Sequence, residues 1–148
     1  MTVLPRDCVV DASVGIKLVL AEVGSVEARA LFAPLSDDDP PRLAVPDLFF
    51  IECANILWKN TRRGTLSVAD GQTGLASLIA LALATTPTAH LAPRALEIAA
   101  AHDVSAYDAA YLALAERLDL PLVTADTRLA RSVAASSFRV VLLPTAAE

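Results

Sequence analysis

The chain has 148 residues, which is enough for one domain with a core that needs no disulfide or metal support. Hydrophobic residues make up 55% of the chain, a share that excludes an intrinsically disordered protein. The formal net charge of −5 argues against a broadly basic surface of the kind that binds nucleic acid. We therefore expect a single folded domain over residues 1–148.

Two features bear on the cellular compartment. The two cysteines, Cys8 and Cys53, lie inside apolar runs and are expected to be buried thiols rather than disulfide or zinc ligands. The N-terminus has no apolar stretch behind a basic region, and the longest apolar window, residues 75–84, is too short to span a bilayer. We expect a cytoplasmic protein without a signal peptide or membrane segment.

Short apolar runs alternate with helical periodicity along the chain. In the first half, strands are expected at residues 8–10 and 43–45, and helices at residues 12–21, 26–33 and 46–63. In the second half, helices are expected at residues 67–81, 88–102, 105–118 and 127–135, and strands at residues 83–85, 120–124 and 140–143. Ser25 is expected to cap the second helix, and Gly64 to end the third.

This alternation predicts an α/β fold, a three-layer α/β/α sandwich with a short parallel sheet. The strands read as continuous apolar runs rather than alternating ones, which is typical of strands covered on both faces. In such sheets ligands bind beyond the carboxyl ends of the strands.

Two acids follow predicted strands at that edge. Asp11 ends the run CVVD, and Asp126 comes after LPLVT, just before a helix. Each is equally well explained as an N-cap, since aspartate accepts hydrogen bonds from the first turn of a helix.

Two more acids lie on predicted helices in apolar surroundings. Glu52 lies in LFFIECANIL, where an unpaired buried carboxylate needs an ion pair, a cation or an opening to water. Asp108 lies in SAYDAAYLALAE, three residues after Ser105, a pattern that also fits a helix cap.

Taken together, the four acids (Asp11, Glu52, Asp108 and Asp126) indicate that they share one site at this edge of the sheet. Several carboxylates in one pocket repel one another and raise each other's pKa, so a hard cation stabilises them. Oxygen ligands without His or Cys select Mg²⁺ or Mn²⁺, and the chemistry this suits is metal-assisted phosphodiester hydrolysis.

Four motifs in this order, VVDAS, PDLFFIECANIL, SAYDAAYLALAE and LPLVTADTRLA, resemble those of PIN-domain ribonucleases. More narrowly, they resemble the VapC-type toxins of bacterial and archaeal toxin–antitoxin pairs, from Cys8 to Pro144. The resemblance implies a small α/β/α fold, Mg²⁺ or Mn²⁺ bound by the four acids as catalytic and metal-binding residues, and endonucleolytic cleavage of RNA. It implies supporting roles for Ser13, Asn55 and Thr124.

Six basic residues lie near these acids in the sequence. They are Lys17, Lys59, Arg62, Arg63, Arg128 and Arg131. They are interpreted either as favourable charges at helix ends and on solvated faces, or as phosphate contacts that flank the metal site.

The resemblance also implies partners: an RNA substrate, a cognate VapB-like antitoxin whose C-terminal segment inhibits the nuclease, and a homodimer. Phe49, Phe50 and Trp58 share one predicted helix, which indicates either core packing or an exposed groove that receives a partner's helix. Two alternatives stay open. One is a catalytically silent PIN-like protein-binding module, which the four acids argue against, and the other is a housekeeping RNA-processing nuclease.

Overall fold

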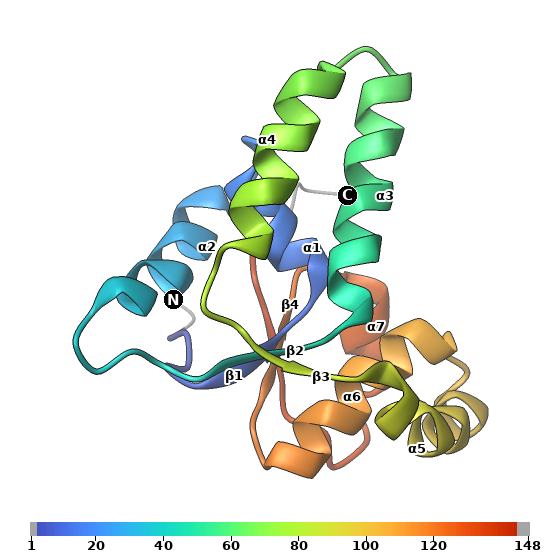
Figure 1. Cartoon of the computed structure of the whole chain (residues 1–148). Coiled ribbons are helices and arrows are strands. Elements are labelled where there is room, and N and C mark those ends of the chain that lie inside the picture. Colours follow the sequence, from blue (N-terminus) through green and yellow to red (C-terminus); the bar gives the residue numbers. More distant parts are fainter. Residues whose placement is uncertain (1–2, 145–148) are drawn as a thin grey trace.

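Five short parallel strands form one sheet at the centre of the molecule (Figure 1). They are β1 (Cys8–Val10), β2 (Leu43–Pro46), β3 (Ala84–Thr86), β4 (Leu122–Thr124) and β5 (Val140–Leu142). The computed structural model describes residues 3–144. The inner strands β1, β2 and β4 are buried along their whole length, which confirms the interpretation of their continuous apolar runs.

The strand order, β3-β2-β1-β4-β5, places β1 in the middle of the sheet. The chain moves outward from β1 through β2 and β3, then returns to the other side of β1 to form β4 and β5. The carboxyl ends of β1 and β4 therefore lie side by side where the direction of winding reverses. This is the position at which open α/β sheets bind ligands.

Helices cover both faces of the sheet, so the predicted three-layer architecture is confirmed (Figure 1). The α-helices are α1 (Ala12–Gly15), α2 (Ser25–Phe32), α3 (Leu48–Arg62), α4 (Val68–Ile79), α5 (Thr88–His102), α6 (Ala106–Leu118) and α7 (Thr127–Ser132). The 3-10 turns are η1 (Ile16–Leu18) and η2 (Ala33–Ser36). In Figure 1, α3 and α4 form a hairpin that projects from one side of the sheet, while α5 and α6 pack together on the other.

Local sequence signals placed several boundaries correctly. Gly64 adopts a φ of 78° directly after the long helix α3, a left-handed conformation that glycine adopts without strain. Ser105 and Ser67 each accept a hydrogen bond from a backbone N–H in the first turn of the helix that follows. Both cysteines are buried free thiols, as expected.

The first predicted helix is too long, and its successor is capped differently. α1 ends at Gly15 and the chain tightens into η1, because glycine and the β-branched residues around it are weak helix formers. Gly24, with a φ of 93°, takes the N-cap position that was expected of Ser25. The Ser25 hydroxyl instead accepts from Glu22 N and donates to Leu20 O, so it closes the preceding loop.

Several later boundaries also differ from expectation, by three residues at most. α7 ends at Ser132 rather than residue 135, and β4 begins at Leu122 rather than residue 120. No helix within residues 3–144 is both long and apolar enough to cross a bilayer.

Candidate active site

Asp11 lies at the carboxyl end of β1, at the reversal point of the sheet. Its backbone N–H donates to Val123 O at 3.0 Å, so the pairing of β1 with β4 continues past the last residue of the strand. The side chain is buried, with 6% of the residue exposed. Its Oδ2 accepts hydrogen bonds from Ser13 Oγ at 2.6 Å and from Thr124 Oγ1 at 2.9 Å.

Backbone amides fix the direction of both hydroxyl donors. Ala125 N donates to Ser13 Oγ at 2.9 Å, and Asp126 N donates to Thr124 Oγ1 at 3.1 Å. Each hydroxyl has a single proton, so a hydroxyl that accepts from the backbone is left to donate that proton to the carboxylate of Asp11. The position of this carboxylate is therefore set by the ends of two neighbouring strands.

Glu52 reaches the same region from the second turn of α3. The hydroxyl of Tyr111, a fully buried residue on α6, donates to Glu52 Oε1 at 2.6 Å. A side chain from one helix layer thereby holds a carboxylate of the other layer. Tyr111 was not among the residues predicted to belong to the site. Its position three residues after Asp108, hence on the same helix face, is the signal that could have indicated this role.

Asp108 lies in the first turn of α6. Its backbone N–H donates to Ser105 Oγ at 3.1 Å, so the expected cap is formed by the serine, and the Asp108 side chain is half-buried.

The pKa values show that the acids act on one another. Burial raises the pKa of Glu52 from its usual 4.5 to about 7, and the charges of Asp11 and Asp108 raise it further, against the lowering effect of the Tyr111 bond. Burial also raises the pKa of Asp108 from 3.8 to about 6, with contributions from Asp11 and Asp126. The pKa of Asp11 is raised by burial although its two hydroxyl donors lower it. The fold therefore brings the four acids into one electrostatic cluster.

Asp126 also accepts hydrogen bonds from the first turn of the helix that follows it. Its Oδ1 accepts from Arg128 N at 3.0 Å and from Leu129 N at 3.2 Å, so the side chain caps α7. The alternative interpretation as an N-cap is confirmed for this residue. Its charge nevertheless raises the pKa of both Asp11 and Asp108.

A model of the PIN domain family matches residues 8–134, a span that contains all four acids. The chain belongs to the PIN-domain family. Ribonuclease VapC9 of Mycobacterium tuberculosis is 41% identical over 121 residues, which cover 82% of this chain and 87% of that protein. Ribonuclease VapC3 of Pyrobaculum aerophilum is 36% identical over 124 residues, covering 82% and 91% of the two chains. Within the family, the chain therefore belongs with the VapC proteins.

Solved structures show the same fold. VapC20 of Mycobacterium tuberculosis, described as a Sarcin-Ricin loop cleaving toxin, superposes with a TM-score of 0.65 at 20% identity, covering 89% of this chain and 96% of that one. A toxin–antitoxin complex from Klebsiella pneumoniae superposes with a TM-score of 0.61 at 18% identity, covering 94% and 99%. At these identities the likeness shows the PIN fold alone.

The donor set of this PIN domain fits a hard divalent cation. All four clustered side chains offer carboxylate oxygens, the ligands that Mg²⁺ and Mn²⁺ prefer. Within residues 3–144 no three or more His, Cys, Asp or Glu side chains are arranged to hold a metal ion directly. Mg²⁺ is usually bound by only one or two carboxylates and keeps several waters, so a site that binds it does not need three side-chain ligands.

One of the predicted phosphate contacts is wrong. Lys17 is buried, with 7% of its side chain exposed, and its Nζ donates to Glu22 Oε1 at 3.0 Å and to Val23 O at 2.6 Å. This ammonium holds the loop after η1 and does not face solvent, so it is not placed to meet RNA.

The other basic residues lie on exposed surface. Arg128 and Arg131 lie on α7 beside Asp126, and Lys59, Arg62 and Arg63 lie at the far end of α3. Asn55 is exposed on α3, close to one turn after Glu52.

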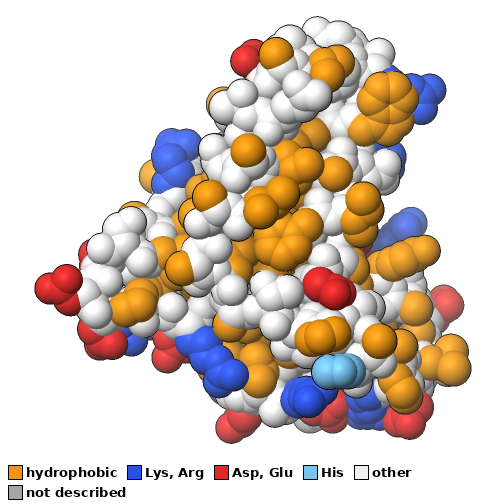
Figure 2. All heavy atoms as spheres, in the orientation of Figure 1, with side chains coloured by type: hydrophobic (Ala, Val, Ile, Leu, Met, Phe, Trp, Pro, Cys, Tyr) orange, Lys and Arg blue, Asp and Glu red, His pale blue; other side chains and the backbone are white. Residues whose placement is uncertain are grey.

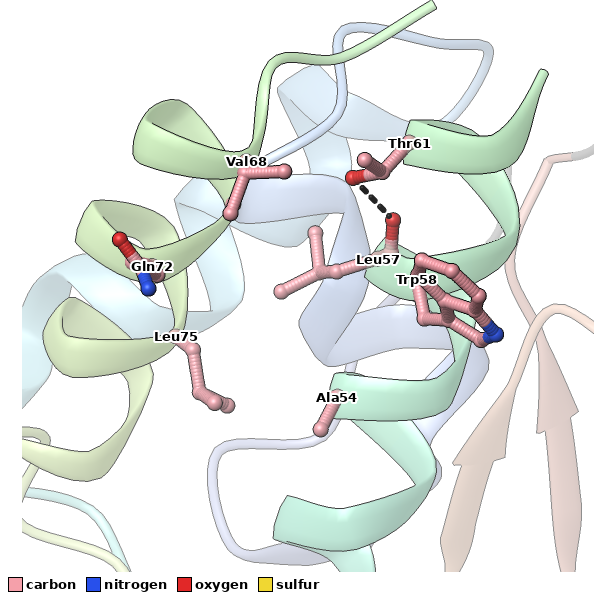
Figure 3. Close-up of a pocket in the computed structure, with 8 residues that line it drawn as sticks. Ala54, Leu57, Trp58, Thr61, Val68, Gln72 and Leu75 are labelled. Carbon is pink, nitrogen blue, oxygen red and sulfur yellow. Dashed lines mark hydrogen bonds between the residues drawn. The ribbon is translucent and has the colours of Figure 1, made fainter. Parts of the chain in front are cut away.

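The two alternatives for the aromatic residues of α3 each apply to a different residue. Phe49 is fully buried, whereas Trp58 is 56% exposed beside a groove of about 200 Å³ between α3 and α4. Figure 3 shows Leu57 and Leu75 directed between the two helices, with Trp58 at the outer side of α3. Phe49 therefore packs in the core, whereas Trp58 lies at the surface beside the groove.

Proposed function

We propose that this PIN domain is a divalent-metal-dependent endoribonuclease, the toxin of a VapBC-type toxin–antitoxin pair. The observation that carries the proposal is the buried carboxylate of Asp11, fixed by two hydroxyl donors at the reversal point of the sheet and clustered with Glu52 and Asp108. The relatives of this chain in the VapC group are named ribonucleases. RNA is accordingly the proposed substrate.

Asp11 and Asp108 are the residues that we expect to hold Mg²⁺ or Mn²⁺. A cation bound there would lower the pKa of a water molecule and offset the negative charge of the scissile phosphate. Asp126 adds negative charge while capping α7, which makes it the least direct of the four acids.

Glu52 is suited to move a proton. Without a bound cation, a pKa of about 7 leaves Glu52 partly ionised near neutral pH, and a cation held by Asp11 and Asp108 would favour the ionised form that a general base needs. Tyr111 donates to Oε1, so this hydrogen bond holds the carboxylate in position. We propose that Glu52 orients and deprotonates the attacking water.

We also propose a VapB-like antitoxin as the partner, a homodimeric assembly, and the cytoplasm as the location. A toxin–antitoxin complex shares this fold, which supports the first of these. The apolar groove between α3 and α4, visible as an orange band in Figure 2, is the surface that we assign to an antitoxin segment.

The test is cleavage of total RNA with Mg²⁺, with Mn²⁺ and with a chelator. We expect cleavage with either cation, none with the chelator, and loss of cleavage in Asp11→Asn. The matched control is Asp38→Asn, since Asp38 is an exposed acid in the loop before β2, at the opposite edge of the sheet from the carboxyl ends of β1 and β4. Calorimetry with Mn²⁺ adds a readout besides activity. Undiminished cleavage or Mn²⁺ binding by a folded Asp11→Asn variant would overturn the assignment.

A further inference from the structure

The far end of α3 carries a group of three exposed cations. Lys59, Arg62 and Arg63 line one hollow of about 350 Å³. None of the three forms an ion pair with a carboxylate of residues 3–144, in contrast to Arg94, which pairs with two glutamates. The sequence has no Asp or Glu after Glu52 until Asp70. Figure 2 shows Lys and Arg side chains along the outer side of this helix.

The helix dipole explains part of this pattern, since cations are favourable in the last turn of any helix. It does not explain why the three side chains line one hollow. The guanidinium of Arg62 also lies over the ring of the exposed Trp58, 5.8 Å from its centroid. A guanidinium stacked on an aromatic face keeps the N–H groups at its edge available, and their planar fork matches a phosphate.

Helix geometry relates this group to the acids. Lys59 and Arg63 follow Glu52 by seven and eleven residues, close to two and three full turns, so all three lie on one face of α3. At a rise of about 1.5 Å per residue, the two cations lie about 10 and 16 Å along the helix from Glu52. A stacked strand of nucleic acid advances about 3.4 Å per nucleotide, so this interval corresponds to about three to five nucleotides.

We propose that Lys59, Arg62 and Arg63 form a phosphate-binding subsite for single-stranded RNA, about three to five nucleotides from the bond that is cut. The inference rests on the proposed ribonuclease function and adds to it the path of the substrate along α3. Contacts with phosphates position a strand without reading its bases. The subsite therefore contributes affinity and register, and sequence preference arises elsewhere.

The experiment uses fluorescein-labelled mixed-sequence RNAs of 16 and 4 nucleotides, with binding measured in a chelator so that no strand is cut. The variant is Lys59→Ala/Arg63→Ala, which keeps Arg62 on Trp58, the only tryptophan of the chain and thus a fluorescent reporter beside the subsite. The matched control is Arg29→Ala/Arg117→Ala, because both arginines are exposed, without an ion pair among the described residues, and on other helices.

We expect the variant to bind the 16-nucleotide RNA about tenfold more weakly, and the 4-nucleotide RNA more weakly as well, because without a divalent cation the acids repel phosphate and either strand is held by the cations of α3. The slope of log affinity against log salt should fall by about 1.4, because each phosphate contact with a single strand contributes about 0.7. Quenching of Trp58 by the long RNA should diminish as well. A charge-reversed variant, Lys59→Glu/Arg63→Glu, should show a larger loss, and the arginine control should show none.

Unchanged affinity and salt slope in a variant whose wild type cleaves RNA would overturn the subsite while leaving the proposed function intact. Absence of cleavage by the wild type with Mg²⁺ and Mn²⁺ would instead overturn the proposed function. Unchanged RNA binding together with weaker binding of a decaglutamate peptide would assign the cations to an acidic protein partner and also overturn the subsite.

Discussion

Replacing Glu52 by Gln should stabilise the fold at alkaline pH while impairing cleavage. The pKa of this half-buried carboxyl is raised from 4.5 to about 7, chiefly by burial, so ionising it in the folded state is unfavourable. Each pKa unit corresponds to about 1.4 kcal/mol, which gives about 3 kcal/mol for the full difference. Because the side chain is only partly buried, solvent screening reduces the expected gain to about 1–3 kcal/mol.

The pH window of this effect follows from proton binding. Between pH 4.5 and about 7 the folded protein keeps a proton on Glu52 that the unfolded chain has released, so the stability of the wild type falls as pH rises through this range. Below pH 4.5 both states are protonated and the variant should gain nothing. Above pH 7 both are ionised and the gain is complete. The amide of Gln still accepts the hydrogen bond from Tyr111, so the packing is kept.

Urea unfolding at pH 4 and pH 8 in a chelator measures this difference directly, with Asp38→Asn as the control for removal of any acid. Addition of Mn²⁺ at pH 8 should stabilise the wild type more than the variant, since a bound cation relieves the repulsion that Gln removes permanently. A variant that is less stable than the wild type at pH 8, or equally stabilised at both pH values, would refute the electrostatic reasoning.

Three further outcomes are expected. Thr124→Val removes one hydroxyl donor to the carboxylate at the end of β1 and should lower Mn²⁺ affinity and cleavage by about 10–100-fold, measured by calorimetry and RNA cleavage; unchanged Mn²⁺ affinity would contradict this. Tyr111→Phe removes the bond that lowers the pKa of Glu52, so the acid limb of the pH–rate profile should move to higher pH; an unmoved limb would show that Glu52 is not the base. Lys17→Met should destabilise the fold by about 1–3 kcal/mol in urea, because it leaves Glu22 and a backbone carbonyl without their donor, yet should not alter the salt dependence of RNA binding; a reduced salt slope would restore Lys17 as a phosphate contact.

The fold was largely predictable because its signals are local. Alternating strand and helix patterns gave the layers, and Gly64 and Ser105 marked helix ends through conformations and hydrogen bonds that depend on a few neighbouring residues. The errors lie where local preferences compete. Gly15 and the β-branched residues around it end α1 early, although the apolar spacing of the following residues continues the helical pattern. The Ser25 hydroxyl closes the loop after η1 instead of capping the helix that follows.

The acid cluster was predictable for a different reason. Parallel strands end at one edge, so acids that follow strands must lie near one another, as Asp11 and Asp126 do. The order of the strands cannot be read in this way, so the reversal point beside β1 was not foreseen. The bond from Tyr111 to Glu52 joins residues 59 positions apart on opposite layers, and the burial of Lys17 depends on how the following loop folds.

The separation of charges along α3 reconciles the net charge of −5 with a substrate that is itself an anion. At physiological ionic strength the screening length is about 8 Å, shorter than the rise of about 10–16 Å from Glu52 to Lys59 and Arg63. The potential near each group is therefore set by its own neighbours, and the cations at the far end of the helix attract phosphate despite the acids at its base. Under the proposed function, a divalent cation offsets the charge of the acids before a phosphate approaches them. The same helix then carries a cation-independent contact for the strand and a cation-dependent site for its cleavage, so binding in a chelator and cleavage with Mg²⁺ report on different ends of α3.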